Sequence, residues 1–110
     1  MRVPDVFVNR VFTDWLPVYC AARGYSTDGF KATSLKVEPA DARDCMLAID
    51  YGVLVDNKDG KYRAARSAAH EVLFWEGSRA AIPRPITLWL EPVITFAALA
   101  RLHIIYSWPK

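Results

Sequence analysis

The amino-acid sequence predicts an α+β fold, with a mostly antiparallel sheet of about three to five strands packed by N-terminal helices and a C-terminal helix. Three observations predict it. Apolar residues recur with helical spacing near both ends, runs that favour strands lie between turn sequences in the middle, and helices do not alternate with strands as in a parallel doubly wound sheet. A chain of 110 residues can bury one sizeable core, so we expect a single α+β domain over residues 1–110.

The first expected elements are two helices separated near Pro17. Pro4 suits the first position of a helix, and Pro17 would break an uninterrupted one because it clashes with the carbonyl four residues earlier. We therefore expect one helix to about Thr13 and a second that Asp14 caps. Gly24 is typical of a left-handed helix end. The apolar residues with helical spacing are Phe7, Val8, Val11, Phe12, Trp15, Leu16 and Tyr19.

The next segment is predicted to be mainly extended. Residues 25–29 (YSTDG) suit a turn, and residues 30–37 a weak strand whose polar side chains fit a sheet edge. Residues 39–44 (PADARD) are a loop or one helical turn. The strongest predicted strand covers residues 45–55, because alternate residues are apolar: Cys45, Leu47, Ile49, Tyr51, Val53 and Val55.

A hairpin is expected after this strand. Residues 56–60 (DNKDG) have turn chemistry, and residues 61–66 (KYRAAR) would return as the antiparallel partner. Residues 68–77 are ambiguous, because Ser67 could cap a helix whereas the run VLFW favours a buried strand; we prefer the strand.

The chain is expected to close with a strand and a helix. Residues 86–90 (ITLWL) form a strand that ends at Pro92. The final helix ends at Trp108–Pro109, and its apolar face has spacings of three and four: Phe96, Leu99, Leu102, His103 and Tyr106.

Charge and hydropathy exclude several classes of protein. The longest stretch without a charge, residues 92–100, is far shorter than the roughly 20 apolar residues of a membrane-spanning helix. Asp5 and Arg10 interrupt any secretory signal, so we expect a cytoplasmic protein. The net charge is only +2, but residues 1–57 carry six basic and eight acidic side chains, and residues 58–110 eight and four. This asymmetry suits an anionic partner or complementary faces of an oligomer.

Sequence motifs for common enzymes and cofactors are absent. The five glycines are isolated, so neither GxGxxG nor a P-loop occurs, and no HExxH, GxSxG or zinc-type Cys/His set is present. We therefore expect no cofactor and no bound metal. Cys20 and Cys45 form no CxxC pair and are expected to be buried small hydrophobes rather than a disulfide.

One hypothesis assigns acid–base chemistry to His70, Glu91 and His103. Imidazole titrates near neutral pH, and a carboxylate could orient it. A half-buried structural histidine is the alternative explanation for each ring. Glu91 lies between a predicted strand and Pro92, where it would also stabilise the N-terminus of the last helix.

A second hypothesis places ligand binding in the second half, which is rich in aromatic and cationic residues. Trp, Tyr and Arg supply most of the binding free energy at many interfaces. A sheet covered on one face only would expose some of these side chains. The alternative is that the tryptophans build the core. The residues we assign to this ligand-binding surface are Arg63, Arg66, His70, Trp75, Trp89 and Glu91.

The leading functional interpretation is a non-enzymatic binding or assembly module. It would form a homo-oligomer and bind a small organic molecule or peptide in an aromatic-lined cleft. A small hydrolase or isomerase using a His/Glu pair is the first alternative, and a nucleic-acid-binding or anti-phage accessory protein is the second. The pI of 8.6 ranks nucleic acid as the weaker partner, and no membrane partner is expected.

In size and general character the chain resembles the small orphan proteins encoded by mobile gene cassettes of integrons. No motif carries this resemblance, and it implies no activity and no role for any residue.

Overall fold

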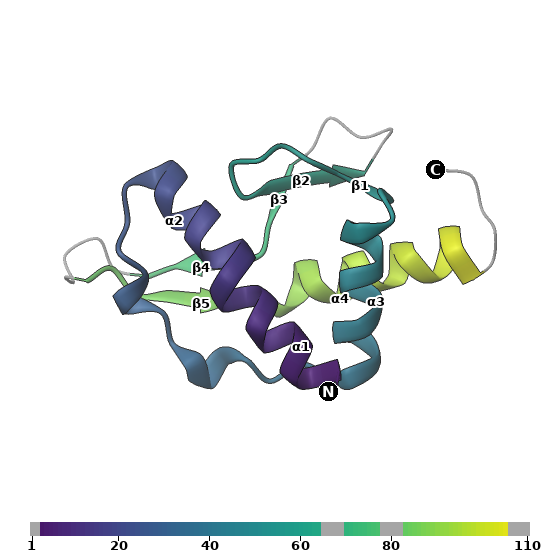
Figure 1. Cartoon of the computed structure of the whole chain (residues 1–110), viewed down its shortest axis with the longest axis horizontal. Coiled ribbons are helices and arrows are strands. Elements are labelled where there is room, and N and C mark those ends of the chain that lie inside the picture. The colour runs from purple at the N-terminus through teal and green to yellow at the C-terminus, as the bar shows by residue number, and fades with distance from the viewer. Residues whose placement is uncertain (1–2, 65–69, 78–82, 106–110) are drawn as a thin grey trace.

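The computed structural model describes residues 3–64, 70–77 and 83–105, and it has the predicted α+β class (Figure 1). No helix in these ranges combines the length and apolar character needed to cross a membrane. In chain order the elements are α1 (Val3–Arg10), a π-helical turn (Val11–Trp15), α2 (Leu16–Arg23), two 3-10 turns (Thr27–Gly29 and Ala32–Ser34), α3 (Pro39–Asp50), β1 (Leu54–Asp56), β2 (Lys61–Ala64), β3 (Glu71–Val72), β4 (Phe74–Glu76), β5 (Ile86–Leu88), α4 (Leu90–Ala100) and a second π-helical turn (Arg101–Ile105).

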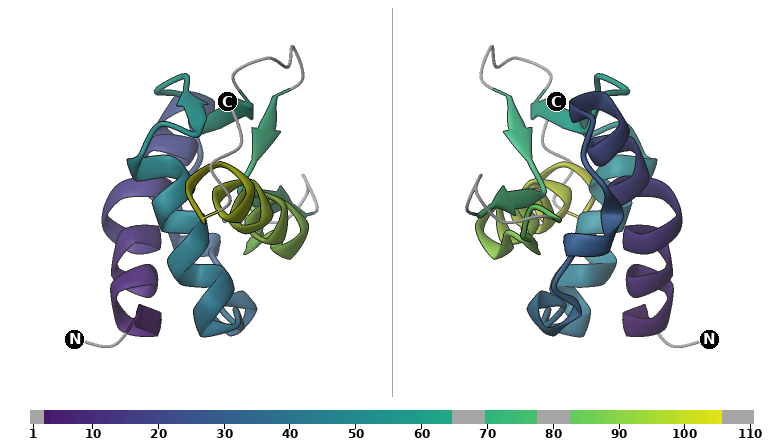
Figure 2. Two further views of the ribbon diagram at one scale, coloured as in Figure 1. Left: turned by 90° about the vertical axis from the view of Figure 1, so that its right-hand side faces the viewer. Right: turned by 90° about the vertical axis from the view of Figure 1, so that its left-hand side faces the viewer.

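Three helices form the centre of the molecule. α3 lies between α1 and α4, and α4 crosses it, so that α4 is seen nearly end-on in Figure 2. Phe7 and Val11 on the first helix, Cys45 on α3 and Phe96 on α4 are all buried in one core. Burial of each such large apolar side chain contributes roughly 1.5–3 kcal/mol to folding. Phe96 also meets Tyr62 of β2 edge to face at 5.8 Å between ring centroids, which joins the strands to the helices.

The predicted break between the two N-terminal helices is wrong. The chain stays helical through Pro17, and the π turn before it widens the helix: the N–H of Leu16 donates to the carbonyl of Val11, five residues earlier. Pro17 then falls in the first turn of α2, where its missing N–H is tolerated. The predicted end at Gly24 is confirmed, because this residue has φ +71° and its N–H donates to Ala21.

The predicted strand over residues 45–55 is wrong for most of its length. Residues 39–50 form α3, with Pro39 in its first turn, and only Leu54–Asp56 is extended. α3 has helices on two sides, so it buries more than one face. This burial obscured the helical period and left an apparent alternation of apolar residues.

The weak strand predicted over residues 30–37 is also wrong. The segment contains the 3-10 turn Ala32–Ser34 and a single parallel bridge between Phe30 and Ile86. The N–H of Lys31 donates to the carbonyl of Ile86 at 2.8 Å. This one contact replaces the ladder that a full strand would form.

The described strands make two small antiparallel sheets, β1-β2-β3 and β4-β5. The predicted hairpin is confirmed, with Leu54 opposite Ala64 and Asp56 opposite Tyr62; residues 65 and 66 lie outside the described part. The strand preferred over residues 68–77 is confirmed for β3 and β4. The last strand is shorter than predicted, because Leu90 already begins α4, whose existence is confirmed.

Candidate functional site

The candidate site is a cavity of about 370 Å³ between α2 and the β4-β5 hairpin, which we call the aromatic cleft. Strands and the segments next to them supply most of its wall, and α2 supplies two side chains one helical turn apart. The lining residues are Tyr19, Arg23, Val72, Phe74, Trp75, Glu76, Arg84 and Trp89.

The hairpin brings the two tryptophans of the cleft together. Trp75 pairs with Thr87 across the β4-β5 ladder, and the N–H of Trp89 donates to the carbonyl of Leu73 at 2.7 Å. The two indole rings therefore meet edge to face, 6.0 Å between centroids. Alternation along β4 buries Phe74 and leaves Trp75 57% exposed.

Arg23 fixes the α2 side of the cleft. Its guanidinium lies 3.9 Å from the centre of the Tyr19 ring, and its Nη1 donates to the carbonyls of Tyr19 and Asp59 at 3.0 and 2.9 Å. The second bond ties the β1-β2 turn to α2. Gly60 permits this approach, because a Cβ there would lie 3.0 Å from the Cα of Tyr19.

Glu76 is the centre of the polar network. Its Oε2 accepts a hydrogen bond from the Tyr19 hydroxyl at 2.5 Å, and its Oε1 accepts from the Tyr25 hydroxyl at 3.2 Å. Arg84 Nη2 lies 3.1 Å from Oε1, and Arg84 Nη1 donates to the Tyr25 oxygen at 2.6 Å. Two tyrosines and an arginine therefore hold one carboxylate from three different segments.

The network shifts the pKa values of Glu76 and Tyr19 in opposite directions. Burial raises the pKa of Glu76, but the hydrogen bonds from Tyr19 and Tyr25 and the charges of Arg84 and Arg23 outweigh it, so the pKa lies below its ordinary value. Burial and the hydrogen bond to Glu76 raise the pKa of Tyr19. At neutral pH the carboxylate is therefore ionised and the phenol is protonated.

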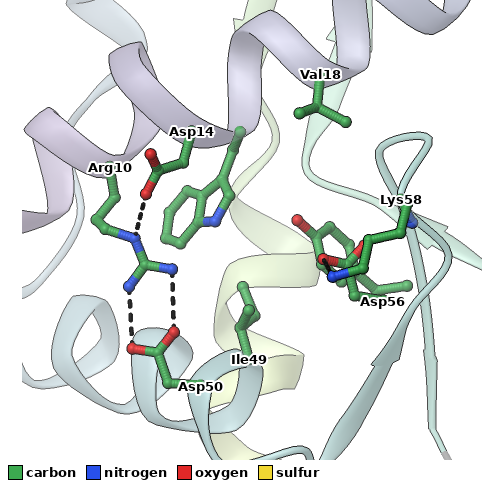
Figure 3. Close-up of a pocket in the computed structure, with 9 residues that line it drawn as sticks. Arg10, Asp14, Val18, Ile49, Asp50, Asp56 and Lys58 are labelled. Atoms are coloured by element: carbon green, nitrogen blue, oxygen red, sulfur yellow. Dashed lines mark hydrogen bonds and ion pairs between the residues drawn. The ribbon is translucent and has the colours of Figure 1, made fainter.

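A second cavity, of about 600 Å³, lies between the π turn, the end of α3 and the β1-β2 turn (Figure 3). Arg10 bridges two acidic residues there, with both terminal nitrogens 3.0 Å from Asp50 and its Nε 2.8 Å from Asp14. Trp15 is almost entirely buried beneath them. The charged side chains of this cavity mainly join α1 to α3 and satisfy one another.

The structure brings together only part of the predicted ligand-binding surface. Trp75 and Trp89 both line the aromatic cleft, whereas Arg63 lies on β2, and exposed His70 and Glu91 line neither cavity. Arg66 lies outside the described residues.

The predicted acid–base group does not come together as a unit. Glu91 is in the first turn of α4 and His103 lies twelve residues further along the helix. At the helical rise the two are separated by about 18 Å along the axis, too far for a hydrogen bond. Glu91 occupies the position expected for interaction with the helix dipole.

Six of the eight cleft residues were not among the predicted site residues. Two of the six are apolar, Val72 and Phe74, and the four with polar groups are Tyr19, Arg23, Glu76 and Arg84. Tyr19 and Arg23 fit ordinary roles in a helix, one in its apolar face and one near its C-terminus. Glu76 and Arg84 flank a segment whose sequence has neither helical nor strand periodicity. A hint was available in the four-residue spacing of Tyr19 and Arg23, which places both side chains on one helical face.

Both cysteines are buried free thiols, and neither lines the aromatic cleft. Burial raises the pKa of Cys45 to about 12, and it also raises the pKa of Cys20. The prediction that they are buried small hydrophobes is confirmed, and neither has the lowered pKa of a nucleophile.

Comparison with models of protein families found no match to this chain, and comparisons with curated proteins and with solved structures found no significant similarity. The resemblance to integron cassette proteins therefore stays a prediction. Arguments about function start from the geometry of the cleft.

Proposed function

We propose that this protein is a non-enzymatic binding module whose aromatic cleft takes a small organic molecule. The observation that carries the proposal is the pair formed by Trp75 and Trp89 at the cavity. Trp75 keeps more than half of its surface in water although it sits on a short, paired strand. An exposed ring held by a fixed backbone loses little freedom on binding a flat apolar group.

The proton affinities in the cleft favour binding over catalysis. A general acid or base works best when its pKa lies near the operating pH. The pKa of Glu76 lies below its ordinary value and that of Tyr19 above, so both are displaced away from neutrality. The hydrolase or isomerase that would use His70, Glu91 or His103 stays an alternative of lower rank.

A nucleic-acid-binding role is the other lower-ranked alternative. Two arginines of the basic second half are already paired with carboxylates: Arg84 with Glu76, and Arg101 with Asp41 and Asp44. These pairs reduce the charge left for phosphates. This alternative predicts DNA or RNA affinity that falls steeply with salt concentration, as filter binding at two ionic strengths would measure.

Self-association is the second part of the proposal. Leu90 and Ile94 are one turn apart on α4 and are 39% and 50% exposed. A second copy of the chain is the occupant we propose for this face, because the acidic first half and basic second half of two copies attract one another. The predicted cytoplasmic location is in keeping with two free thiols.

Binding at the cleft is tested with indole, a neutral planar probe. We expect saturable shifts of the Trp75 and Trp89 indole N–H signals in two-dimensional NMR of the ¹⁵N-labelled protein. Trp75→Ala should weaken the affinity by about tenfold, through the lost ring contact and apolar area. Tyr51→Ala is the matched control, because Tyr51 is 62% exposed and does not line the cleft. Absence of saturable shifts, or unchanged affinity in Trp75→Ala, would contradict the proposal.

A further inference from the structure

We infer that the aromatic cleft selects a small organic acid, with its carboxylate at the free edge of the Arg23 guanidinium and its planar part against Trp75. This inference rests on the proposed binding function and names the class of ligand. It follows from the charge balance of the cleft, from the donors that its arginines leave unused and from the size of the cavity.

The charge balance of the cleft is positive. Two guanidinium groups, Arg23 and Arg84, face one carboxylate, Glu76, among the residues that line the cavity. The side chains of both arginines are only 18% exposed and that of Glu76 is 25% exposed, so water screens these charges less than on an open surface. One additional negative charge would neutralise the site.

The arginines also keep hydrogen-bond donors that the described network does not use. Among the described residues Arg23 donates hydrogen bonds through Nη1 alone. Its Nε forms an ion pair with Glu76 Oε2 at 3.8 Å, beyond hydrogen-bonding distance. Its guanidinium stacks on Tyr19, and the Nε–Nη2 edge is the one that we assign to the ligand carboxylate, because a guanidinium edge can donate two parallel hydrogen bonds. The Nε of Arg84 is buried and has no acceptor among the described residues.

The dimensions of the cleft favour a small molecule over a peptide. Its volume of about 370 Å³ lies near the lower end of the range for small-molecule sites, which begins at roughly 300 Å³. Trp75, Trp89 and Phe74 supply apolar ring surface within the same cavity as the two arginines. A flat ring that carries one carboxylate would contact the apolar rings with its face and an arginine with its carboxylate.

Three probes with one ring and different charges test the inference: indole-3-acetate, indole-3-acetamide and tryptamine. We expect indole-3-acetate to bind at least about tenfold more tightly than the amide at low salt, since a charged hydrogen bond replaces a neutral one. Tryptamine should bind most weakly, and the preference for the acid should shrink as salt is added. The affinities are measured by the same NMR titration.

Two variants test the assigned groups. Arg23→Gln should reduce the acid-to-amide ratio to about one, and this ratio is insensitive to a general loss of stability because both probes are measured on the same protein. Glu76→Gln keeps the shape but raises the local charge by one, so it should raise the acid-to-amide affinity ratio severalfold.

The outcomes separate the inference from the proposed function. If all three probes bind equally and Trp75→Ala weakens each, the cleft is a binding site but the inference is wrong. If the acid-to-amide ratio is unchanged in both Arg23→Gln and Glu76→Gln, the assignment to these charges is wrong. If no probe binds, the proposed function itself fails.

Discussion

Glu76 shows how one residue can join distant parts of a small protein. It accepts hydrogen bonds from Tyr19 and Tyr25 and pairs with Arg84, and these partners come from α2, the segment after it and the segment before β5. A partly buried carboxylate with several donors is stable because the donors offset its lost hydration. The aromatic cleft is consequently held in one arrangement before any ligand enters it.

The lowered pKa of Glu76 predicts a specific dependence of stability on pH. Since the folded pKa is below the ordinary value of 4.5, the contribution to the free energy of unfolding is complete above that value and is lost as the pH falls through the folded pKa. We expect urea unfolding of the native chain to lose more stability between pH 6 and 3 than Glu76→Gln loses. Exposed Glu71 on β3 provides the control, Glu71→Gln, which should follow the native chain. Parallel pH profiles for the native chain and Glu76→Gln would contradict this account.

Asp44 is the buried charged residue in the described part of the chain. Its side chain is 1% exposed and lies 2.9 Å from Arg43 and 2.7 Å from Arg101. Burial raises the pKa of Asp44, but the hydrogen bonds and charges of the two arginines outweigh it, so the pKa is lower than usual. Arg101 follows α4 and Asp44 lies on α3, so the pair fixes where these helices cross.

Removal of this carboxylate should destabilise the fold. We expect Asp44→Ala to lower the free energy of unfolding by about 2–3 kcal/mol, because it leaves Arg101 with one partner and opens a small cavity. Arg43→Ala should cost much less than Asp44→Ala, since the Arg43 side chain is 56% exposed and water screens its charge. Urea denaturation at pH 7 measures both. Equal losses for the two variants would show that burial of Asp44 does not control the effect.

At the level of elements, the π turn is the feature that local patterns did not reveal. It adds one residue to the helix, so that Val11 and Trp15 before Pro17 and Leu16 and Tyr19 around it can all face the core. A regular α-helix through this segment would rotate one half by about 100° relative to the other. Burial of both halves therefore selects the wider turn.

Deletion of exposed Thr13 tests this interpretation. The deletion should restore regular α-helical hydrogen bonding but place Pro17 in a helix interior, at a cost of about 3 kcal/mol in the free energy of unfolding. Combining the deletion with Pro17→Ala should recover most of that loss. Pro17→Ala alone, in which the π turn remains, is the control and should change stability little. Chemical denaturation followed by far-ultraviolet circular dichroism measures all three; no recovery in the double variant would contradict the proposed role of the proline.

At the level of the whole molecule, thickness limits how much the chain can bury. The shortest dimension is 19 Å, about two helix diameters. Large apolar side chains are therefore left on the surface, among them Ile94 and Trp75. An apolar side chain on an exposed helix face gains free energy when another surface covers it.

The proposed self-association makes a clear prediction. In sedimentation velocity at micromolar concentration, the native chain should sediment as a dimer or larger species, and Ile94→Lys should shift it toward the monomer by at least about tenfold in dissociation constant, because a charge would be buried in the contact. Thr95→Lys, at the next exposed position of α4, should behave like the native chain. A native chain that is monomeric under these conditions would overturn the proposal.

Several features of this protein follow from contacts between residues close in the chain. The helix stop at Gly24, the turn at residues 56–60 and the final helix were predictable, because glycine conformation, turn chemistry and apolar spacing act within a few residues. The aromatic character of the second half also indicated Trp75 and Trp89 as candidate ligand contacts. None of these predictions required knowledge of the tertiary arrangement.

Other features depend on residues far apart in the chain, and local patterns could not specify them. α3 is a helix between two helices, so its apolar positions follow the surfaces of α1 and α4 rather than a simple period. Tyr19 and Glu76 meet across 57 positions and Tyr25 and Arg84 across 59. The free energy of such long-range packing outweighs the small differences in local propensity, and for this reason the polar half of the cleft emerges only when the chain is folded.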